Sequence, residues 1–348
     1  MQLSFCKKHI VAAILALMML PVSVASQAAE KVYQLSFTSH DPVTSQKSKD
    51  MQDWCDRIKK ASSGRVDITL YAGGTIASAV EALDAVKSGS ADVGWIFTSF
   101  FPGQFPITEA VMLPLIGVKT PQQAAAALWD LYEESEALRN ELNRDYKALL
   151  VYTNPINRIA TSKKPVATVA DLKGLKFRAP AGTATDMITA WGGVPILMGP
   201  GDMYSALDKG VLDGFVFEYS GVKSFKLYEV AKYYTSIDFF ASPFLILINK
   251  NTWNSLPANL QEIIMKESGR EASIRFAKSF EADADSGLQV IKANGGKVIT
   301  PDDKALDDFK VAARDYAQAW INKHQSDKFD ARAYFNRLVE LLAKHKDL

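Results

Sequence analysis

The sequence predicts an α/β protein with two lobes and a helical C-terminal region, on the basis of three observations. Short apolar segments typical of strands alternate with amphipathic helical segments between residues 32 and 97. A second series of the same kind starts near residue 176. Beyond Pro257 the apolar residues recur at helical spacing. The chain has 348 residues, 48% hydrophobic and 23% charged, which suits two folded domains and excludes a disordered chain, a collagen and a small disulfide-stapled scaffold.

The first residues have the pattern of a secretory signal peptide. A pair of lysines at residues 7–8 precedes an apolar run over residues 10–19, and small residues follow. The alternative is a membrane anchor, but about 10 to 14 apolar residues are fewer than the roughly 20 that cross a bilayer. We therefore expect residues 1–28 to be a signal peptide, cleaved near Ala28, and the mature protein to be exported.

Cysteine content and charge exclude two further classes. Cys6 leaves with the leader, and the one remaining cysteine, Cys55, cannot form an internal disulfide. Cys55 shares helical spacing with Met51, Trp54 and Ile58, which predicts an inert cysteine in the core. Forty Lys and Arg residues stand against 39 Asp and Glu residues, so the chain lacks the basic excess of a nucleic-acid binder. We expect no nucleic-acid partner.

The first series of segments predicts a parallel sheet flanked by helices. Strands are expected over residues 32–37, 66–70 and 93–97, and helices over residues 51–58 and 80–86. Ligands of such sheets bind beyond the carboxyl ends of the strands. The three loops that follow the strands are residues 40–44, 72–77 and 98–103. His40, Thr75 and Ser99 lie in these loops and are candidate ligand-binding residues.

The later segments predict a change of lobe and a return. A helix over 128–142 and a strand over 148–153 lead into a loop from Asn154 to Arg158, where the chain leaves the first lobe. The second series contains a strand over 176–178, helices over 183–191 and 202–209, and a strand over 213–217. The very apolar segment 244–248 fits the buried centre of a sheet. We expect lobe I to comprise residues 29–155 and 244–283, and lobe II residues 156–243 and 284–348.

Sequence motifs of catalysis are missing. The three histidines of the mature chain, His40, His324 and His345, have no metal-ligand spacing. No nucleophile elbow and no phosphate-binding glycine loop occurs in the sequence. We expect a protein that is not an enzyme and that uses no cofactor and no metal. A secreted hydrolase or lyase stays as an alternative, because catalytic groups can assemble from distant residues.

Two arginines lie at, or a few residues after, the end of a predicted strand. Arg178 ends the strand 176–178, and Arg158 lies 20 residues earlier in the loop that connects the lobes. A guanidinium group presents a planar fork of donors that fits a carboxylate bidentately. Either arginine can therefore anchor an organic acid in a cleft. The alternative is a surface salt bridge, which is the more common role of an isolated arginine.

Around Arg178 the sequence resembles the DctP-type solute receptors of TRAP transporters. The run Asp-Leu-Lys-Gly-Leu-Lys-Phe-Arg-Ala-Pro at 171–180 carries the resemblance, followed by Leu-Asp-Lys-Gly-Val-Leu-Asp-Gly at 207–214 and by Ser-Phe-Lys-Leu-Tyr-Glu at 224–229. Shorter matches lie at 63–66, 113–114, 249–250, Trp253 and 255–257. The resemblance covers about residues 32–330. It implies a periplasmic binding protein of two α/β lobes with mixed sheets and a hinge cleft, which closes over an organic acid and delivers it to a membrane symporter.

The resemblance also assigns roles to residues. Arg178 matches the strand-end arginine that pairs with the ligand carboxylate, and Arg158 matches a second arginine that some members use. The sequence departs from receptors of sugar acids at Phe217, because those usually have an asparagine there. An aliphatic or aromatic acid, with a 2-oxo or 2-hydroxy group as an option, therefore fits better. For Glu218 three roles stay open, namely contact with a ligand hydroxyl or ammonium, coordination of a cation, and exposure to solvent.

The remaining expectations concern the pocket wall and the partners. Trp95 belongs to a group of aromatic residues around the third predicted strand and its loop that can form an apolar wall. Asn154 follows the strand at the change of lobe and is a further candidate for ligand binding. We expect a monomer that delivers its ligand to TRAP membrane subunits. A receptor that feeds a sensor kinase is the alternative within the same fold.

Overall fold

The computed structural model describes residues 31–114 and 116–348, so the expected signal peptide lies outside the described residues. The first lobe contains a mixed five-stranded sheet in the order β2-β1-β3-β10-β4. Its strands are β1 (Tyr33–Thr38), β2 (Val66–Tyr71), β3 (Val93–Phe97), β4 (Tyr146–Thr153) and β10 (Pro243–Asn249). β1 is parallel to β2 and β3, as predicted, whereas β10 runs antiparallel to β3 and β4. Every residue of β10 is buried, which agrees with the predicted central strand.

The helices of the first lobe follow the predicted pattern with one exception. α2 (Gln46–Ala61) buries Cys55 in the core, and α3 (Ala82–Ser88) ends at Gly89, whose φ of 81° is left-handed. The helix expected over 128–142 is wrong, because two helices occupy this region, α4 (Pro121–Glu134) and α5 (Glu136–Asn143). Ser135 separates them with an extended backbone and caps α5 by accepting a hydrogen bond from the Leu138 amide.

The second lobe contains a six-stranded mixed sheet in the order β11-β9-β5-β8-β6-β7. Its strands are β5 (Arg158–Thr161), β6 (Lys176–Arg178), β7 (Val194–Ile196), β8 (Gly214–Phe217), β9 (Tyr233–Thr235) and β11 (Lys297–Ile299). Its helices include α6 (Thr183–Ala190), α7 (Pro200–Asp208) and α8 (Tyr219–Ser224). Gly214 is required where β8 passes β5, since a Cβ atom there would lie 2.3 Å from the Ala160 carbonyl oxygen. This close pairing fixes the position of the following residues, Phe217 and Glu218.

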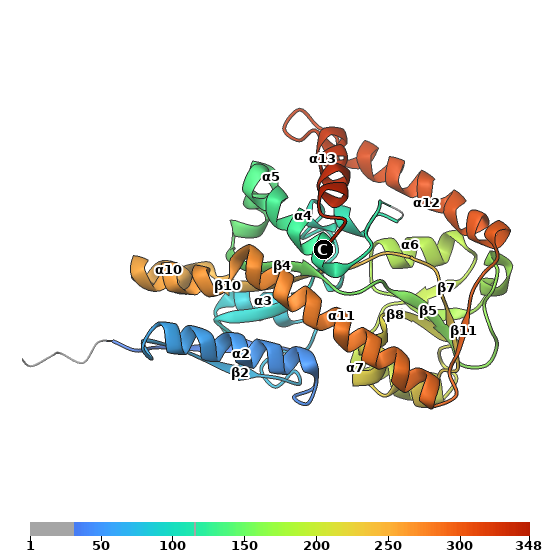
Figure 1. The fold of residues 1–348 in the computed structure, drawn as a ribbon, viewed down its shortest axis with the longest axis horizontal. Helices are drawn as coiled ribbons and strands as arrows, with labels where there is room; N and C mark the ends of the chain where they lie inside the picture. Colours follow the sequence, from blue (N-terminus) through green and yellow to red (C-terminus); the bar gives the residue numbers. More distant parts are fainter. Residues whose placement is uncertain (1–30, 115) are drawn as a thin grey trace, which may run out of the picture. The chain divides into compact units, whose positions relative to one another are not determined.

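The C-terminal region is helical, as predicted. It contains α9 (Lys250–Ser255), α10 (Ala258–Glu267), α11 (Gly269–Ala293), α12 (Asp303–His324) and α13 (Ala331–Lys344). α11 packs against α2 and α4 of the first lobe and against α8 of the second, so it links the two lobes (Figure 1). At Gly287 it approaches α8 so closely that a Cβ atom would lie 2.2 Å from the Tyr219 carbonyl oxygen. No helix of residues 31–114 and 116–348 is long and apolar enough to span a membrane.

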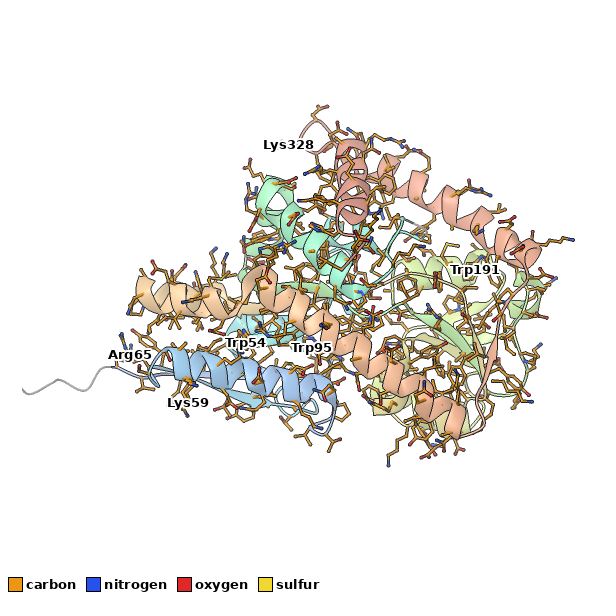
Figure 2. The ribbon with its side chains drawn as sticks, in the orientation of Figure 1. Trp54, Lys59, Arg65, Trp95, Trp191 and Lys328 are labelled. Carbon is orange, nitrogen blue, oxygen red and sulfur yellow. The ribbon has the colours of Figure 1, made fainter. Side chains whose placement is uncertain are left out.

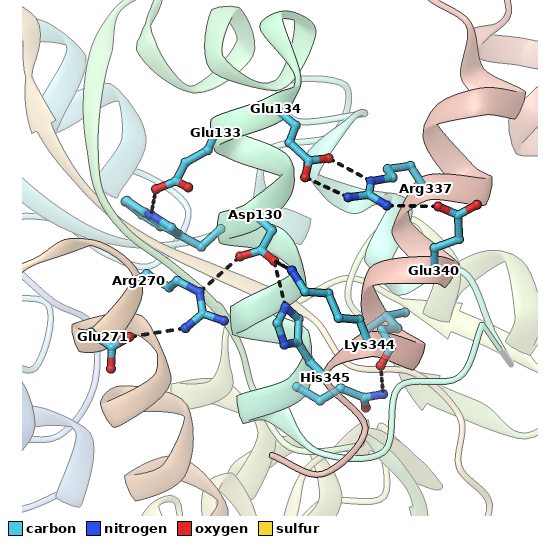
Figure 3. Close-up of polar contacts among 12 residues, drawn as sticks. Asp130, Glu133, Glu134, Arg270, Glu271, Arg337, Glu340, Lys344 and His345 are labelled. Carbon is cyan, nitrogen blue, oxygen red and sulfur yellow. Dashed lines mark hydrogen bonds and ion pairs between the residues drawn. The ribbon is translucent and has the colours of Figure 1, made fainter.

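The last helix contacts the first lobe, and the expected division of the chain into lobes stays a prediction. α13 packs against α4, although we expected residues 284–348 to belong to lobe II. Asp130 of α4 explains this position, because its carboxylate pairs with Lys344 at 2.9 Å, His345 at 2.8 Å and Arg270 at 3.1 Å (Figure 3). Despite the cost of partial burial, these hydrogen bonds lower the pKa of Asp130 to about 2. The end of the chain is thus held against the first lobe.

Candidate functional site

A small pocket lies where the two lobes meet. His40, Asp41, Lys47 and Trp95 line it from the first lobe, and Arg178, Phe217 and Glu218 line it from the second. The enclosed space measures about 20 Å³, little more than one water molecule occupies. An organic acid therefore needs the lobes to separate before it can enter. This pocket corresponds to the predicted hinge cleft.

Arg178 is the strongest feature of the pocket. It ends β6 and is 1% exposed, and it donates from Nε to the Met198 carbonyl at 3.2 Å and from Nη1 to the Val216 carbonyl at 3.1 Å. Its Nη2 atom is buried without a hydrogen-bond partner among the described residues. Burial lowers the pKa of Arg178 to about 10, which still leaves the group charged at neutral pH. The structure thus holds a fixed, desolvated cation whose Nη2 nitrogen is free to donate to a ligand.

Aromatic rings surround this cation. The Cζ atom of Arg178 lies 5.2 Å from the ring centre of Phe217 and 5.8 Å from that of Phe100. Phe217 is half-buried and lines the pocket, whereas Phe215, on the same face of β8, is fully buried in the core of the second lobe. On the first lobe, Trp95 stacks on Phe244 at 4.7 Å and donates to the Tyr152 hydroxyl at 2.7 Å. The pocket therefore combines a guanidinium group with apolar walls.

Asn154 contributes to the pocket as part of a buried amide network. Its Oδ1 accepts from the Ser242 amide at 2.6 Å, and its Nδ2 donates to Asn157 at 3.3 Å. Asn157 donates in turn to the Phe240 carbonyl at 3.2 Å and also lines the pocket. These bonds tie together two of the segments that connect the lobes, 154–157 and 240–242. Asn154 thus lies at the hinge as well as at the pocket.

Lys47 is a pocket residue that the sequence analysis missed. It is 6% exposed, and its Nζ lies 3.5 Å from Asp41 and 3.7 Å from Asp283. It also donates to the hydroxyls of Ser220 and Ser224 on α8, each at 3.4 Å, and so reaches across to the second lobe. Burial opposes its charge, but the neighbouring carboxylates outweigh burial and raise the pKa of Lys47.

Glu218 lies beside this cluster. It is 2% exposed, which rules out the solvent-facing role that the sequence left open. Its carboxylate accepts from the Ser220 hydroxyl at 2.5 Å and from the Gly221 amide at 2.8 Å, and it caps α8. Burial raises the pKa of Glu218, although Lys47 counteracts this shift. Its contacts are those of a helix cap, and they leave a contact with a ligand open.

Three predicted site residues are not brought to this pocket. Arg158 begins β5 instead of lying in a loop, and it pairs with Asp238 at 3.3 Å and donates to the Ile237 carbonyl at 3.1 Å. Ser99 is buried and donates to the Met112 sulfur at 3.5 Å, while Thr75 is exposed and bonds to the Ala72 carbonyl at 3.2 Å. Position after a strand alone does not decide which loop residues turn toward the ligand.

Comparisons with known proteins agree with the fold and with the sequence motifs. A family model of the bacterial extracellular solute-binding protein family 7, DctP, matches residues 37–323. A monocarboxylate 2-oxoacid-binding periplasmic protein of Nostoc is 29% identical over 70% of this chain and 67% of its own. A 2,3-diketo-L-gulonate-binding periplasmic protein of Escherichia coli is 25% identical over 82% of this chain and 85% of its own.

Solved structures give the same result. A TRAP solute-binding protein from an unidentified marine microbe, specific for aromatic acids, has a TM-score of 0.84 and 26% identity over 90% of this chain and 99% of its own. A TRAP solute-binding protein from Rhodoferax ferrireducens, with bound benzoate, has a TM-score of 0.84 and 26% identity, and the match covers 91% of this chain and 99% of that protein. These matches confirm the predicted two-lobed fold and the resemblance. The chain therefore belongs to the DctP family, and it is a solute-binding protein of the periplasmic TRAP type and not an enzyme.

Proposed function

We propose that this protein captures a small monocarboxylate with an apolar or aromatic body and delivers it to the membrane subunits of a TRAP transporter. Arg178 is the observation that carries the proposal. Its buried Nη2 has no partner among the described residues, and burial is the one cause that shifts its pKa, with no neighbouring carboxylate contributing. A ligand carboxylate supplies the missing acceptor and charge. In a water-excluded site this pair is far stronger than in solution.

The walls of the pocket support an apolar ligand body. Phe217, Phe225 and Trp95 line the space, and the ring of Phe217 lies 6.1 Å from that of Phe225. Three of the similar proteins support this proposal, since one binds monocarboxylate 2-oxoacids and two bind aromatic acids, whereas the Escherichia coli relative binds 2,3-diketo-L-gulonate, a more polar acid. A larger cavity of about 300 Å³ is lined by Trp191, Phe309 and the segment 237–241, and its cations among the described residues are two lysines, Lys119 and Lys310, which lack the planar fork of an arginine. It is therefore a poorer candidate for an acid.

Hinge closure predicts two linked effects of ligand binding. A ligand at about 100 times its dissociation constant is expected to raise the unfolding free energy by roughly 2.7 kcal/mol, because it binds only the folded state. The same addition is expected to compact the protein, since contacts such as Lys47 with Ser220 form only when the lobes meet. Calorimetric unfolding and small-angle X-ray scattering measure the two effects. A radius of gyration that is unchanged at saturation contradicts closure.

Phe217 is predicted to set the ligand class. Its ring lies against Arg178, so a ligand hydroxyl placed beside it would lose water without gaining a partner. Such a mismatch costs about 1 to 3 kcal/mol, or roughly 5-fold to 150-fold in affinity. Phe217→Asn is therefore expected to weaken binding of benzoate and to admit a more hydroxylated acid. Isothermal titration of both variants with benzoate and glucuronate is the test. Tight binding of glucuronate to the unaltered protein, with benzoate ignored, is incompatible with this assignment.

The signalling alternative and the enzymatic alternative are separated by simple observations. A receptor returns its ligand chemically unchanged, which chromatography of the released acid measures, whereas a hydrolase or lyase converts it. Two neighbouring genes for membrane proteins favour transport, and a neighbouring kinase gene favours sensing. We retain the predictions of cleavage near Ala28 and of a monomer, which mass spectrometry of the exported protein and sedimentation test directly.

A further inference from the structure

His40 is a pocket residue with one buried ring nitrogen that has no partner among the described residues. It follows β1, and its ring stacks on Trp95 with centres 4.8 Å apart and meets Phe100 edge-on at 6.2 Å (Trp95 is labelled in Figure 2). Its Nδ1 atom is buried and has no hydrogen-bond partner among the described residues. Buried polar atoms in native proteins rarely stay unpaired, so a ligand atom is the expected partner of this nitrogen.

The surroundings keep this ring neutral. The pKa of His40 is lowered to about 4, mainly by burial; Asp41 opposes this shift, and Lys47 and Arg178 add to it. A neutral imidazole has one donor nitrogen and one acceptor nitrogen. It therefore suits a hydroxyl or keto oxygen, and it does not compete with the charged Arg178 for a carboxylate.

His40 and Arg178 are close enough to act on one small ligand. Both contact the same ring, since Phe100 lies 6.2 Å from the His40 ring and 5.8 Å from Cζ of Arg178, and both line the same small pocket. Among the described residues, two further buried polar atoms without a hydrogen-bond partner belong to residues that line this pocket: Nη2 of Arg178, which is the proposed anchor, and Oδ2 of Asp41, which pairs with Lys47 at 3.5 Å. His40 is thus the group that a second polar atom of the ligand meets.

We propose that His40 is a specificity-determining residue that hydrogen-bonds to a hydroxyl or keto oxygen of the ligand, so that the preferred ligand is a hydroxy- or oxo-substituted monocarboxylate. This inference rests on the proposed function, because it requires an acid anchored at Arg178. The inference adds one feature to the ligand: its apolar body, which lies beside Phe217, carries one oxygen substituent that faces the first lobe. His40, and not the anchor Arg178, then distinguishes between acids of equal charge and similar size.

The test compares acids that share one skeleton. Phenylacetate is the parent, mandelate adds a 2-hydroxyl, phenylglyoxylate a 2-oxo group, and 3-hydroxyphenylacetate a ring hydroxyl. In titrations of the unaltered protein, at least one substituted acid is expected to bind about tenfold more tightly than phenylacetate. His40→Phe preserves the stacking on Trp95 but removes the hydrogen bond, and it is expected to bring this ratio close to one. His40→Asn, whose amide overlaps the Nδ1 position, is expected to retain most of the ratio.

His324→Phe is the matched control, since His324 also packs against a tryptophan, Trp320, at 4.7 Å but lies outside the pocket. The control is expected to keep the ratio of the unaltered protein. Equal affinity of the unaltered protein for phenylacetate and all three substituted acids overturns the role of His40 and leaves the proposed function intact. A preference for a substituted acid over phenylacetate that persists in His40→Phe also overturns the role of His40 and leaves the proposed function intact. If neither phenylacetate nor any substituted acid binds, the proposed function fails and the inference fails with it.

Discussion

Replacing Arg178 by alanine is expected to abolish acid binding. Loss of a desolvated charge pair costs on the order of 2 to 5 kcal/mol, which corresponds to about 30-fold to several thousandfold in affinity. Arg178→Lys is expected to fail substantially as well, because a single ammonium cannot reproduce a fork that already donates to Met198 and Val216. Isothermal titration with benzoate measures both losses.

The control for this experiment is Arg337→Ala. Unlike Arg178, Arg337 lies on the surface, where it pairs with Glu134 at 2.8 Å (Figure 3). The Arg337→Ala variant is expected to bind benzoate with the affinity of the unaltered protein. Circular dichroism checks that Arg178→Ala and Arg178→Lys remain folded. Near-normal affinity in folded Arg178→Ala refutes the assignment of Arg178 as the anchor.

Lys47→Met is expected to produce the largest loss of stability. The methionine keeps most of the volume but leaves the carboxylates of Asp41 and Asp283 without this cation. Breaking a buried ion pair by removing one partner costs about 3 to 5 kcal/mol. Lys223 still pairs with Asp283, so the uncompensated charge rests mainly on Asp41. Urea unfolding of the ligand-free protein measures the change.

Lys59→Met on the same helix is the matched control. Lys59 is 52% exposed and pairs with Asp67 at 2.9 Å, and such surface pairs contribute about 0 to 1 kcal/mol (Lys59 is labelled in Figure 2). If Lys47→Met loses no more stability than Lys59→Met, Lys47 is not the centre of a buried charge cluster. Scattering on the same variant is expected to show a more open ligand-free state, because the contacts with Ser220 and Ser224 are lost.

The anchor could be predicted from sequence, because two local signals converge on it. Arg178 ends a short strand, and the motif over 171–180 places it in a known family. Arg158 also follows a predicted strand and also matches the family. However, it contacts Asp238 and the Ile237 carbonyl, about 80 residues away along the chain, and it does not line the pocket. The fold was predictable where periodicity is strong, as in β10. The short strands β5, β7, β9 and β11 have three or four residues each, too few to show a period.

Lys47 is a pocket residue whose burial could not be predicted from the sequence. It lies near the start of α2 in a polar stretch, Gln-Lys-Ser-Lys-Asp, which is typical of a solvated helix end. Its burial comes from α8 and α11, whose contacting residues, such as Ser220 and Asp283, lie more than 170 residues away along the chain. His40 was predicted from its position after β1, but its unpartnered nitrogen became evident only with the packing of Trp95 and Phe100 around it.

A thermal-shift screen of the purified mature protein against a library of small acids tests the central claim most directly. Monocarboxylates with an apolar or aromatic body are expected to raise the melting temperature of the protein, and Arg178→Ala is expected to lose every such shift. The released ligand is expected to be chemically unchanged. Stabilisation by polyhydroxylated sugar acids alone, by no acid in the library, or equally in Arg178→Ala contradicts the claim that Arg178 captures such an acid.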